Sequence, residues 1–169
     1  MDAAALISRR YAICSFLLAL GARKLAAITA GEPAPHFVAK TLDGERLTSA
    51  SLRGKVVLIE FWATWCPPCK SDAPAVDALA KEFDKDGLIV LAVNMGESRR
   101  KVKKYLEAYP RSCKIVLAED TTLAAICEAK SYPLYVLIGR DGNIAGTQNG
   151  AAGEGALRRL LARAGLESE

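Results

Sequence analysis

Histidine is almost absent from this sequence: its 169 residues include a single one, His36. A tetrahedral zinc site needs three or four protein ligands, and two cysteine thiolates cannot complete one. His36 lies in an extended segment with no second ligand at a metal-binding spacing. A copper site built from cysteine and histidine would need a further histidine late in the chain. We therefore expect no metal ion and no other cofactor.

A surplus of basic side chains in the body of the chain is also missing. The net charge is +4, but residues 1–30 hold four basic residues and one acidic residue, which leaves 19 basic and 18 acidic residues elsewhere. Nucleic-acid binding would need basic side chains gathered on the folded domain. The basic cluster at residues 99–104 is more simply the solvated face of a helix. We expect no nucleic-acid partner.

Internal repeats and low-complexity segments are absent as well. With 169 residues, of which 51% are hydrophobic, the chain can bury the core of one domain of ordinary size. We therefore predict one folded domain at residues 31–169, preceded by a leader at residues 1–30.

The leader has the order of an export signal. Arg9 and Arg10 precede a mostly apolar run at residues 11–22, which is too short for a comfortable membrane-spanning helix. Arg23 and Lys24 directly follow the run, where a signal is usually uncharged. Retention as a membrane anchor is therefore a second interpretation, and an N-terminal helix of a cytoplasmic protein is a third. We expect a periplasmic or membrane-associated extracytoplasmic protein.

The body of the chain alternates between strand and helix patterns. Asp-Gly pairs at residues 43–44 and 141–142 predict two hairpins, and the apolar run KVVLIEFW predicts a central strand buried on both faces. We expect strands at 36–41, 45–48, 55–62, 88–93, 114–118, 134–138 and 143–148, and helices at 67–83, 98–109, 121–130 and 154–164. This order predicts an α/β fold with a mixed sheet, partly parallel and partly antiparallel.

Among five cysteines, only Cys66 and Cys69, in the segment WATWCPPC, have the spacing of a motif. Cys66 falls at the N-terminus of a predicted helix, where unpaired backbone N–H groups and the helix dipole favour a negative charge. Such surroundings lower a cysteine pKa from about 8.5 to roughly 3.5 to 7.5. Cys69 lies one turn deeper, within the Cα separation of about 4.4 to 6.8 Å that a disulfide tolerates. We predict that Cys66 is the nucleophile and that Cys69 resolves a mixed disulfide.

Three prolines belong to this helix. Proline is tolerated in a first helical turn, so Pro67 and Pro68 should stiffen the loop without breaking the helix. Pro74 lies further inside, removes a backbone hydrogen bond and should kink the helix near Lys70.

The segment KVVLIEFWATWCPPCKSDAP resembles the active-site segment of the thioredoxin superfamily, in its extracytoplasmic TlpA/ResA-like branch. The resemblance extends over residues 33–165, through the motifs PAPHF, LDGERL and SYPLYVLIGRDGNI. It implies a thioredoxin fold, in which helices flank a central mixed sheet with an added N-terminal β-hairpin. It also implies a thiol-disulfide oxidoreductase that exchanges with exported protein thiols, as a reductant in processes such as cytochrome c maturation. A membrane or periplasmic redox donor and a monomeric state are expected with it.

The resemblance also implies a substrate groove. Pro133 should form a cis peptide bond and face the dithiol, and the backbone of Tyr132 should pair with the extended substrate. Trp65 should shield the thiolate, and Pro67 and Pro68 should line the same site.

Glu60 occupies the position of the buried acid that thioredoxin has beneath its second cysteine. A buried carboxyl has a raised pKa and could accept the proton of Cys69 during its attack. In the other interpretation Glu60 points to a polar edge and takes no part. Asp72 stands where the branch usually has glutamate, and Tyr132 and Leu134 replace smaller residues, so substrate preference is open.

Three alternatives remain at this point. Peroxiredoxins share the fold, but they want a threonine or serine where this chain has Ala63, and a later arginine that is not evident. A binding module without catalysis would use the groove only to hold peptides, although it would not need both thiols. A metal-binding module would need Cys113 and Cys127 as added ligands. These two are more simply buried, inert thiols, and a disulfide between them is a further possibility.

Overall fold

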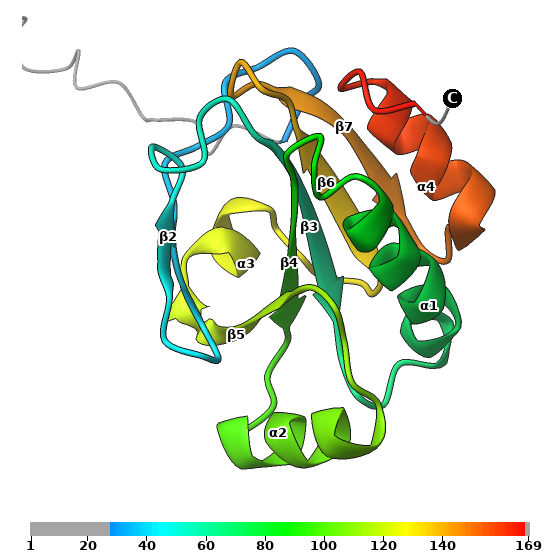
Figure 1. Cartoon of the computed structure of the whole chain (residues 1–169). Coiled ribbons are helices and arrows are strands. Elements are labelled where there is room, and N and C mark those ends of the chain that lie inside the picture. The colour runs from blue at the N-terminus through cyan, green and yellow to red at the C-terminus, as the bar shows by residue number, and fades with distance from the viewer. Residues whose placement is uncertain (1–27, 168–169) are drawn as a thin grey trace, which may run out of the picture.

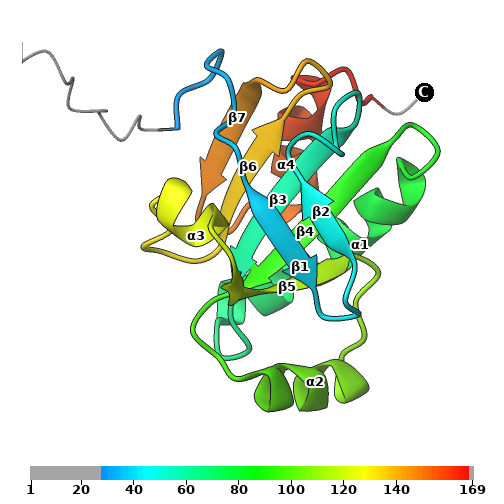
Figure 2. The same cartoon turned by 90° about the vertical axis from the view of Figure 1, so that its left-hand side faces the viewer.

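The computed structural model describes residues 28–167, which contain a seven-stranded sheet and four helices (Figures 1 and 2). The strands are β1 (Val38–Thr41), β2 (Arg46–Thr48), β3 (Val56–Trp62), β4 (Leu88–Asn94), β5 (Lys114–Thr121), β6 (Leu134–Ile138) and β7 (Ile144–Asn149). The helices are α1 (Pro67–Glu82), α2 (Arg99–Ala108), α3 (Leu123–Ile126) and α4 (Gly153–Ala162).

The sheet is mixed, with strand order β2-β1-β5-β4-β3-β6-β7. Strand β3 pairs in parallel with β4, and β4 with β5, whereas the outer pairs are antiparallel. Every residue of β3 is buried, as expected for a central strand with both faces covered. The predicted α/β fold with a mixed sheet is confirmed.

Two apolar cores lie on opposite faces of this sheet. Val57, Ile59 and Phe61 pack toward α3 and the β1–β2 hairpin. The alternate residues of β3 face the other side, where Leu58 packs against α1 and α4. Figure 1 shows α1 and α4 together on that side of the sheet. Because side chains alternate along a strand, Glu60 and Trp62 share the face of Leu58. The chemistry described below therefore lies between β3 and α1.

Both predicted hairpins are present. Asp43 and Gly44 lie in the turn that joins the antiparallel pair β1 and β2, and Asp141 and Gly142 lie between β6 and β7. Gly44 has φ 93° and Gly142 has φ 82°, a region of the backbone that favours glycine. The Asp-Gly signal therefore located both turns correctly.

The helix predicted at residues 121–130 is wrong in most of its length. Strand β5 continues to Thr121, which pairs with Ala39 of β1, and only Leu123–Ile126 form a helix. Asp120, within this strand, binds Arg99 through its carboxylate at 2.6 Å. Glu128 then takes a left-handed φ of 46°, which ends the helical segment. Pairing with the N-terminal hairpin therefore outweighed the local pattern.

The other predicted elements are present with small shifts of their ends. Helix α1 continues through Pro74, and the kink expected near Lys70 stays a prediction. Helix α2 begins after Ser98, whose side chain accepts a hydrogen bond from the backbone N–H of Lys101, and only its Val102 is fully buried. Its basic side chains are a largely solvated face, as predicted.

The predicted leader lies mostly outside the described residues, because the description begins at Ile28. Within residues 28–167, no helix combines the length and the apolar character needed to cross a membrane. The division of the chain into a leader and a domain stays a prediction.

Candidate functional site

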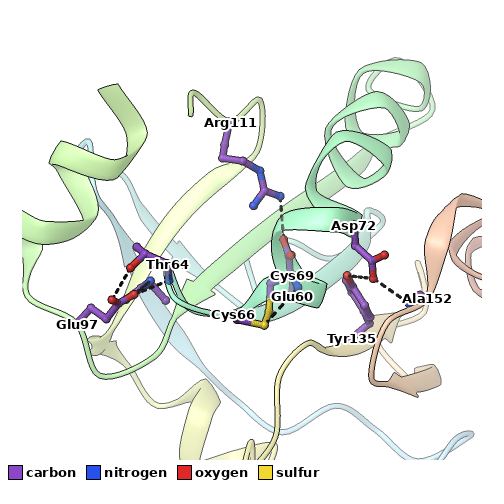
Figure 3. The surroundings of a disulfide bond; sticks show 10 residues. Glu60, Thr64, Cys66, Cys69, Asp72, Glu97, Arg111, Tyr135 and Ala152 are labelled. Atoms are coloured by element: carbon purple, nitrogen blue, oxygen red, sulfur yellow. Dashed lines mark hydrogen bonds and ion pairs between the residues drawn. A yellow bond between two sulfur atoms is a disulfide. The ribbon is translucent and has the colours of Figure 1, made fainter. Parts of the chain in front are cut away.

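Cys66 and Cys69 form a disulfide at the N-terminus of α1, with their Cα atoms 5.3 Å apart (Figure 3). Cys66 is the N-cap residue, with extended backbone, and its Sγ accepts a hydrogen bond from the Cys69 backbone N–H at 3.3 Å. The separation lies within the range expected from the sequence. Only 3% of Cys66 and 2% of Cys69 are exposed, so the sulfur atoms are held against the protein.

Aromatic and proline residues surround the disulfide segment. Trp65 is 60% exposed and its ring meets the ring of Tyr132 edge-on, with centroids 6.1 Å apart. The Tyr132–Pro133 peptide bond is cis, as the resemblance implied. Pro67 is exposed, whereas Pro68 is half-buried. The contact between Trp65 and Tyr132 joins the loop before α1 to the loop before β6.

Glu60 is fully buried, and its carboxylate binds Arg111 at 2.9 Å. The Arg111 side chain is itself only 4% exposed, and its Nε donates to both oxygens of Asp77 at 3.0 Å. The guanidinium lies over the ring of Trp62, 5.7 Å from its centroid. Trp62 packs in one apolar cluster with Cys66 and Cys69. Glu60 therefore belongs to a buried charge network that adjoins the dithiol.

Burial raises the pKa of Glu60, although the positive charge of Arg111 opposes the shift. Burial would lower the pKa of Arg111, but Glu60 and Asp77 outweigh it and raise that pKa. Among the described residues, Glu60 Oε1 has no hydrogen-bond partner. The carboxyl is thus held by one oxygen, while the other can take a proton.

Asp72, which stands where the family usually has glutamate, is buried and hydrogen-bonded on several sides. It is 3% exposed and accepts hydrogen bonds from the Tyr135 hydroxyl at 3.0 Å and from the N–H groups of Ala152 and Gly153 at 2.8 and 3.1 Å. Burial raises the pKa of Tyr135, which favours its neutral, donating form. Asp72 therefore ties α1 to β6 and to the start of α4.

Glu97, which the sequence did not single out, receives four donors. Its Oε2 accepts from the Thr64 N–H at 2.7 Å and from Asn94 Nδ2 at 2.9 Å. Its Oε1 accepts from the Thr64 hydroxyl at 2.6 Å and from Lys101 Nζ at 2.7 Å. Burial alone would raise the pKa of Glu97, but these bonds lower it to about 2. At neutral pH Glu97 is thus an anion beside the loop that precedes Cys66.

This low pKa predicts a pH-dependent contribution to stability. Since the folded-state pKa of Glu97 is below its ordinary value of 4.5, its contribution is complete above about pH 5 and is lost as the pH falls toward 2. Glu97→Gln should lower the free energy of unfolding by about 2 kcal/mol at pH 7. Urea unfolding from pH 3 to pH 7 should show this difference shrinking as the pH falls.

Glu107→Gln, at an exposed position of α2, is the matched control and should change little at any pH. A difference between wild type and Glu97→Gln that stayed constant from pH 3 to pH 7 would contradict this assignment.

Cys113 and Cys127 are free thiols, not a second disulfide. Cys127 packs in the cluster around Val57, and Cys113 packs on the other face of the sheet. Burial raises the pKa of each thiol to about 12, which makes both poor nucleophiles. Within residues 28–167, no three histidine, cysteine, aspartate or glutamate side chains gather as metal ligands.

A mixed sheet with an added hairpin, in which a disulfide caps the first long helix, is the arrangement of thioredoxin-fold disulfide proteins. The sequence agrees with this class, because the model of the AhpC/TSA family matches residues 30–147. That match covers more than half of the chain, and the chain belongs to this family.

Its relatives include proteins named thiol-disulfide oxidoreductase ResA. The protein from Bacillus subtilis is 33% identical over 117 residues, which are 69% of this chain and 65% of the relative. The protein from Halalkalibacterium halodurans is 32% identical over 125 residues, which are 74% and 71% of the two chains. The crystal structure of a thiol:disulfide interchange protein of the thioredoxin family from Chlorobium tepidum matches with a TM-score of 0.70 and 27% identity, over 82% of this chain and 99% of that one.

The predicted resemblance to the ResA-like branch is therefore confirmed. The protein is a thiol-disulfide oxidoreductase with a thioredoxin fold.

Proposed function

We propose that the protein reduces disulfides of exported proteins, with Cys66 as the attacking thiol and Cys69 as the resolving thiol. The observation that carries this assignment is the position of the Cys66 sulfur, which caps α1 and accepts the Cys69 N–H. A thiolate at this place would keep that hydrogen bond and face the positive end of the helix. Cys69 lies inside the first turn of α1 and does not occupy the N-cap position.

The exchange proceeds in two displacements. The Cys66 thiolate attacks one sulfur of a substrate disulfide, forms a mixed disulfide and releases the other substrate sulfur as a thiolate. Cys69 then loses its proton and attacks Cys66 Sγ, which releases the second substrate sulfur. The substrate gains two electrons and becomes a dithiol, and the protein is left with the Cys66–Cys69 disulfide described above.

The proton of Cys69 goes to the Glu60 carboxylate in this proposal. Glu60 is buried on the face of β3 that α1 covers, its pKa is raised by burial, and its Oε1 has no partner among the described residues. Arg111 supports the role because it holds the other oxygen of Glu60 in place. Return of the protein to the dithiol form by a redox donor would run the same steps in reverse.

The substrate should lie across the exposed ring of Trp65 and the cis Tyr132–Pro133 segment. Their edge-on contact places the two loops side by side, next to the helix that carries the cysteines. Pro67, exposed in the first turn of α1, would contact the substrate at one side of the groove, and the half-buried Pro68 would line the same side. The backbone of Tyr132 would pair with an extended substrate segment, as the resemblance implies.

We place the protein in the periplasm or at the outer side of a membrane, with residues 1–30 as an export signal or an anchor. Its substrates would be exported thiol proteins, with apocytochrome c as an example, and its donor a membrane or periplasmic dithiol. The names of the ResA relatives support disulfide exchange and leave its direction open. We propose that the protein acts as a monomer.

A thiol peroxidase is the second candidate, and the geometry favours it less. Ala63, fully buried three residues before Cys66, offers no hydroxyl group there. A peroxiredoxin also needs an arginine beside its reactive cysteine. The buried Arg111 does not fill this role, because it is bound to Glu60 and Asp77. A binding module without catalysis would have no use for a disulfide at the helix cap.

Trapping tests the proposed roles of the two thiols. In Cys69→Ser the resolving thiol is missing, so the mixed disulfide at Cys66 should accumulate at least about tenfold above wild type. Gel shift and mass spectrometry of cells or of a mixture with oxidised insulin would measure it and identify the partner. Cys127→Ser is the matched control and should trap nothing. The assignment would be reversed if Cys69→Ser trapped no mixed disulfide at Cys66 and a Cys66→Ser variant trapped one at Cys69.

The redox potential tests the direction. A reductant should have a potential near the thioredoxin end of the range, about −270 mV, and an oxidant a potential near about −120 mV. Equilibration with glutathione buffers would measure it, and a value near the oxidant end would overturn the reducing role.

A further inference from the structure

Three separate parts of the chain meet at the Glu97 carboxylate. They are Thr64 in the loop between β3 and α1, Asn94 at the end of β4, and Lys101 in the first turn of α2. Figure 3 shows the contact between Glu97 and Thr64. The Glu97 side chain is only 4% exposed. This arrangement connects the loop before Cys66 to the end of β4 and to the first turn of α2, which carry none of the proposed catalytic residues.

We propose that Glu97 is a positioning residue for disulfide exchange, which holds the loop before Cys66 through both the backbone N–H and the hydroxyl group of Thr64. The inference rests on the proposed role of Cys66 as the attacking thiol. Glu97 touches no reacting atom and acts through the backbone of the loop.

A carboxylate is the side chain that this position requires. Each of its oxygens accepts from two donors: one takes the Thr64 N–H and Asn94, and the other takes the Thr64 hydroxyl and Lys101. Glutamine has the same size, but its amide nitrogen donates and cannot accept. In Glu97→Gln, the amide nitrogen would therefore lose hydrogen bonds on the side it occupies, either those from the Thr64 N–H and Asn94 or the charged one from Lys101.

The loop depends on this anchor because its other backbone bonds lie at its two ends. The Trp62 carbonyl accepts from the Met95 N–H at 2.9 Å, and the Ala63 carbonyl accepts from the Cys66 N–H at 3.2 Å. Thr64 lies between them, two residues before Cys66, and is directly followed by the exposed Trp65. Release of Thr64 would let both Cys66 and Trp65 move relative to the N–H groups of α1.

Positioning and simple charge predict opposite effects on Cys66. Glu97 is an anion, so its charge alone disfavours a nearby thiolate, and neutralising it would lower the pKa of Cys66. Loss of positioning would instead turn the thiolate away from the N–H groups that stabilise it and raise that pKa. The sign of the change therefore separates the two.

The experiment measures alkylation of the reduced, full-length protein by iodoacetamide between pH 4 and 10, with the modification of Cys66 followed by mass spectrometry. Compared with wild type, Glu97→Gln should raise the midpoint for Cys66 by at least about 0.5 pH unit and slow insulin reduction about tenfold. Thr64→Val, which keeps the charge of Glu97 and removes one hydrogen bond, should shift the midpoint the same way by less. Thr64→Ser keeps both donors and should behave as wild type.

Arg99→Met is the control for general damage near α2, because it breaks the ion pair with Asp120 and has no contact with Thr64 in the described network. It should leave the midpoint unchanged. A lowered or unchanged midpoint in Glu97→Gln, or equal behaviour of Thr64→Val and Thr64→Ser, would overturn the positioning role. A wild-type midpoint near the ordinary value of about 8.5 would instead overturn the proposed role of Cys66.

Discussion

Replacing Cys66 by serine should abolish disulfide exchange, with a loss of roughly a thousandfold or more in the rate of insulin reduction driven by dithiothreitol. A serine hydroxyl is not ionised at neutral pH and cannot form a mixed disulfide, so the first displacement has no nucleophile. The neighbouring thiol cannot replace it, since Cys69 lies inside the first turn of α1 and does not cap the helix as Cys66 does.

Two other thiols provide the control for this result. Cys127→Ser and Cys113→Ser remove buried thiols whose pKa values are raised to about 12. Both variants should keep insulin reduction close to the wild-type rate if they fold. Full activity in Cys66→Ser would show that another group starts the reaction, and the role proposed for Cys66 would have to be abandoned.

Replacing Arg111 by methionine should destabilise the fold by about 3 to 5 kcal/mol at pH 7, because it leaves buried charges unpaired. Arg111 is the ion-pair partner of both Glu60, which is fully buried, and Asp77. Without the guanidinium, the pKa of Glu60 should rise further, since Arg111 opposes the effect of burial. Urea unfolding at pH 5 and at pH 8 would measure both effects.

The sign of the pH dependence follows from this rise. An acid whose folded-state pKa exceeds its unfolded value of 4.5 binds a proton more readily when folded, so folding becomes less favourable as the pH increases above about 4.5. Arg111→Met should therefore lose more stability at pH 8 than at pH 5.

A second substitution separates loss of charge pairing from loss of packing. Glu60→Gln in the Arg111→Met background removes the unpaired charge and should recover at least about half of the lost stability. If Arg111→Met cost less than about 1 kcal/mol, or if Glu60→Gln recovered nothing, the buried network would have little energetic weight.

Local patterns were sufficient for most of the fold and for the dithiol itself. The apolar run before Trp62 identified the central strand, and its position predicted that Cys66 would cap the following helix. The burial of Glu60 followed from an otherwise apolar strand. The cis bond before Pro133 came from the resemblance and not from any local signal.

The partners of these groups could not be predicted from local patterns. Arg111 lies 51 residues after Glu60, and Glu97 lies 33 residues after Thr64, so neither pair leaves a spacing to recognise. The one signal at hand was the presence of a buried acid, which demands a cation or several donors but does not say which. The strand predicted at residues 114–118 is shorter than β5 for the same reason. The last residue of β5 pairs with β1, which lies far earlier in the chain.

The two ends of β3 have different neighbours. Near its first residue, Gly31 donates to the Ile144 carbonyl, Ala34 to Gly142, and Gly54 to Arg140. The disulfide follows the last residue of β3, and an extended strand of this length is roughly 20 Å long. A protein that reaches the disulfide therefore approaches the end of the sheet opposite to these three contacts.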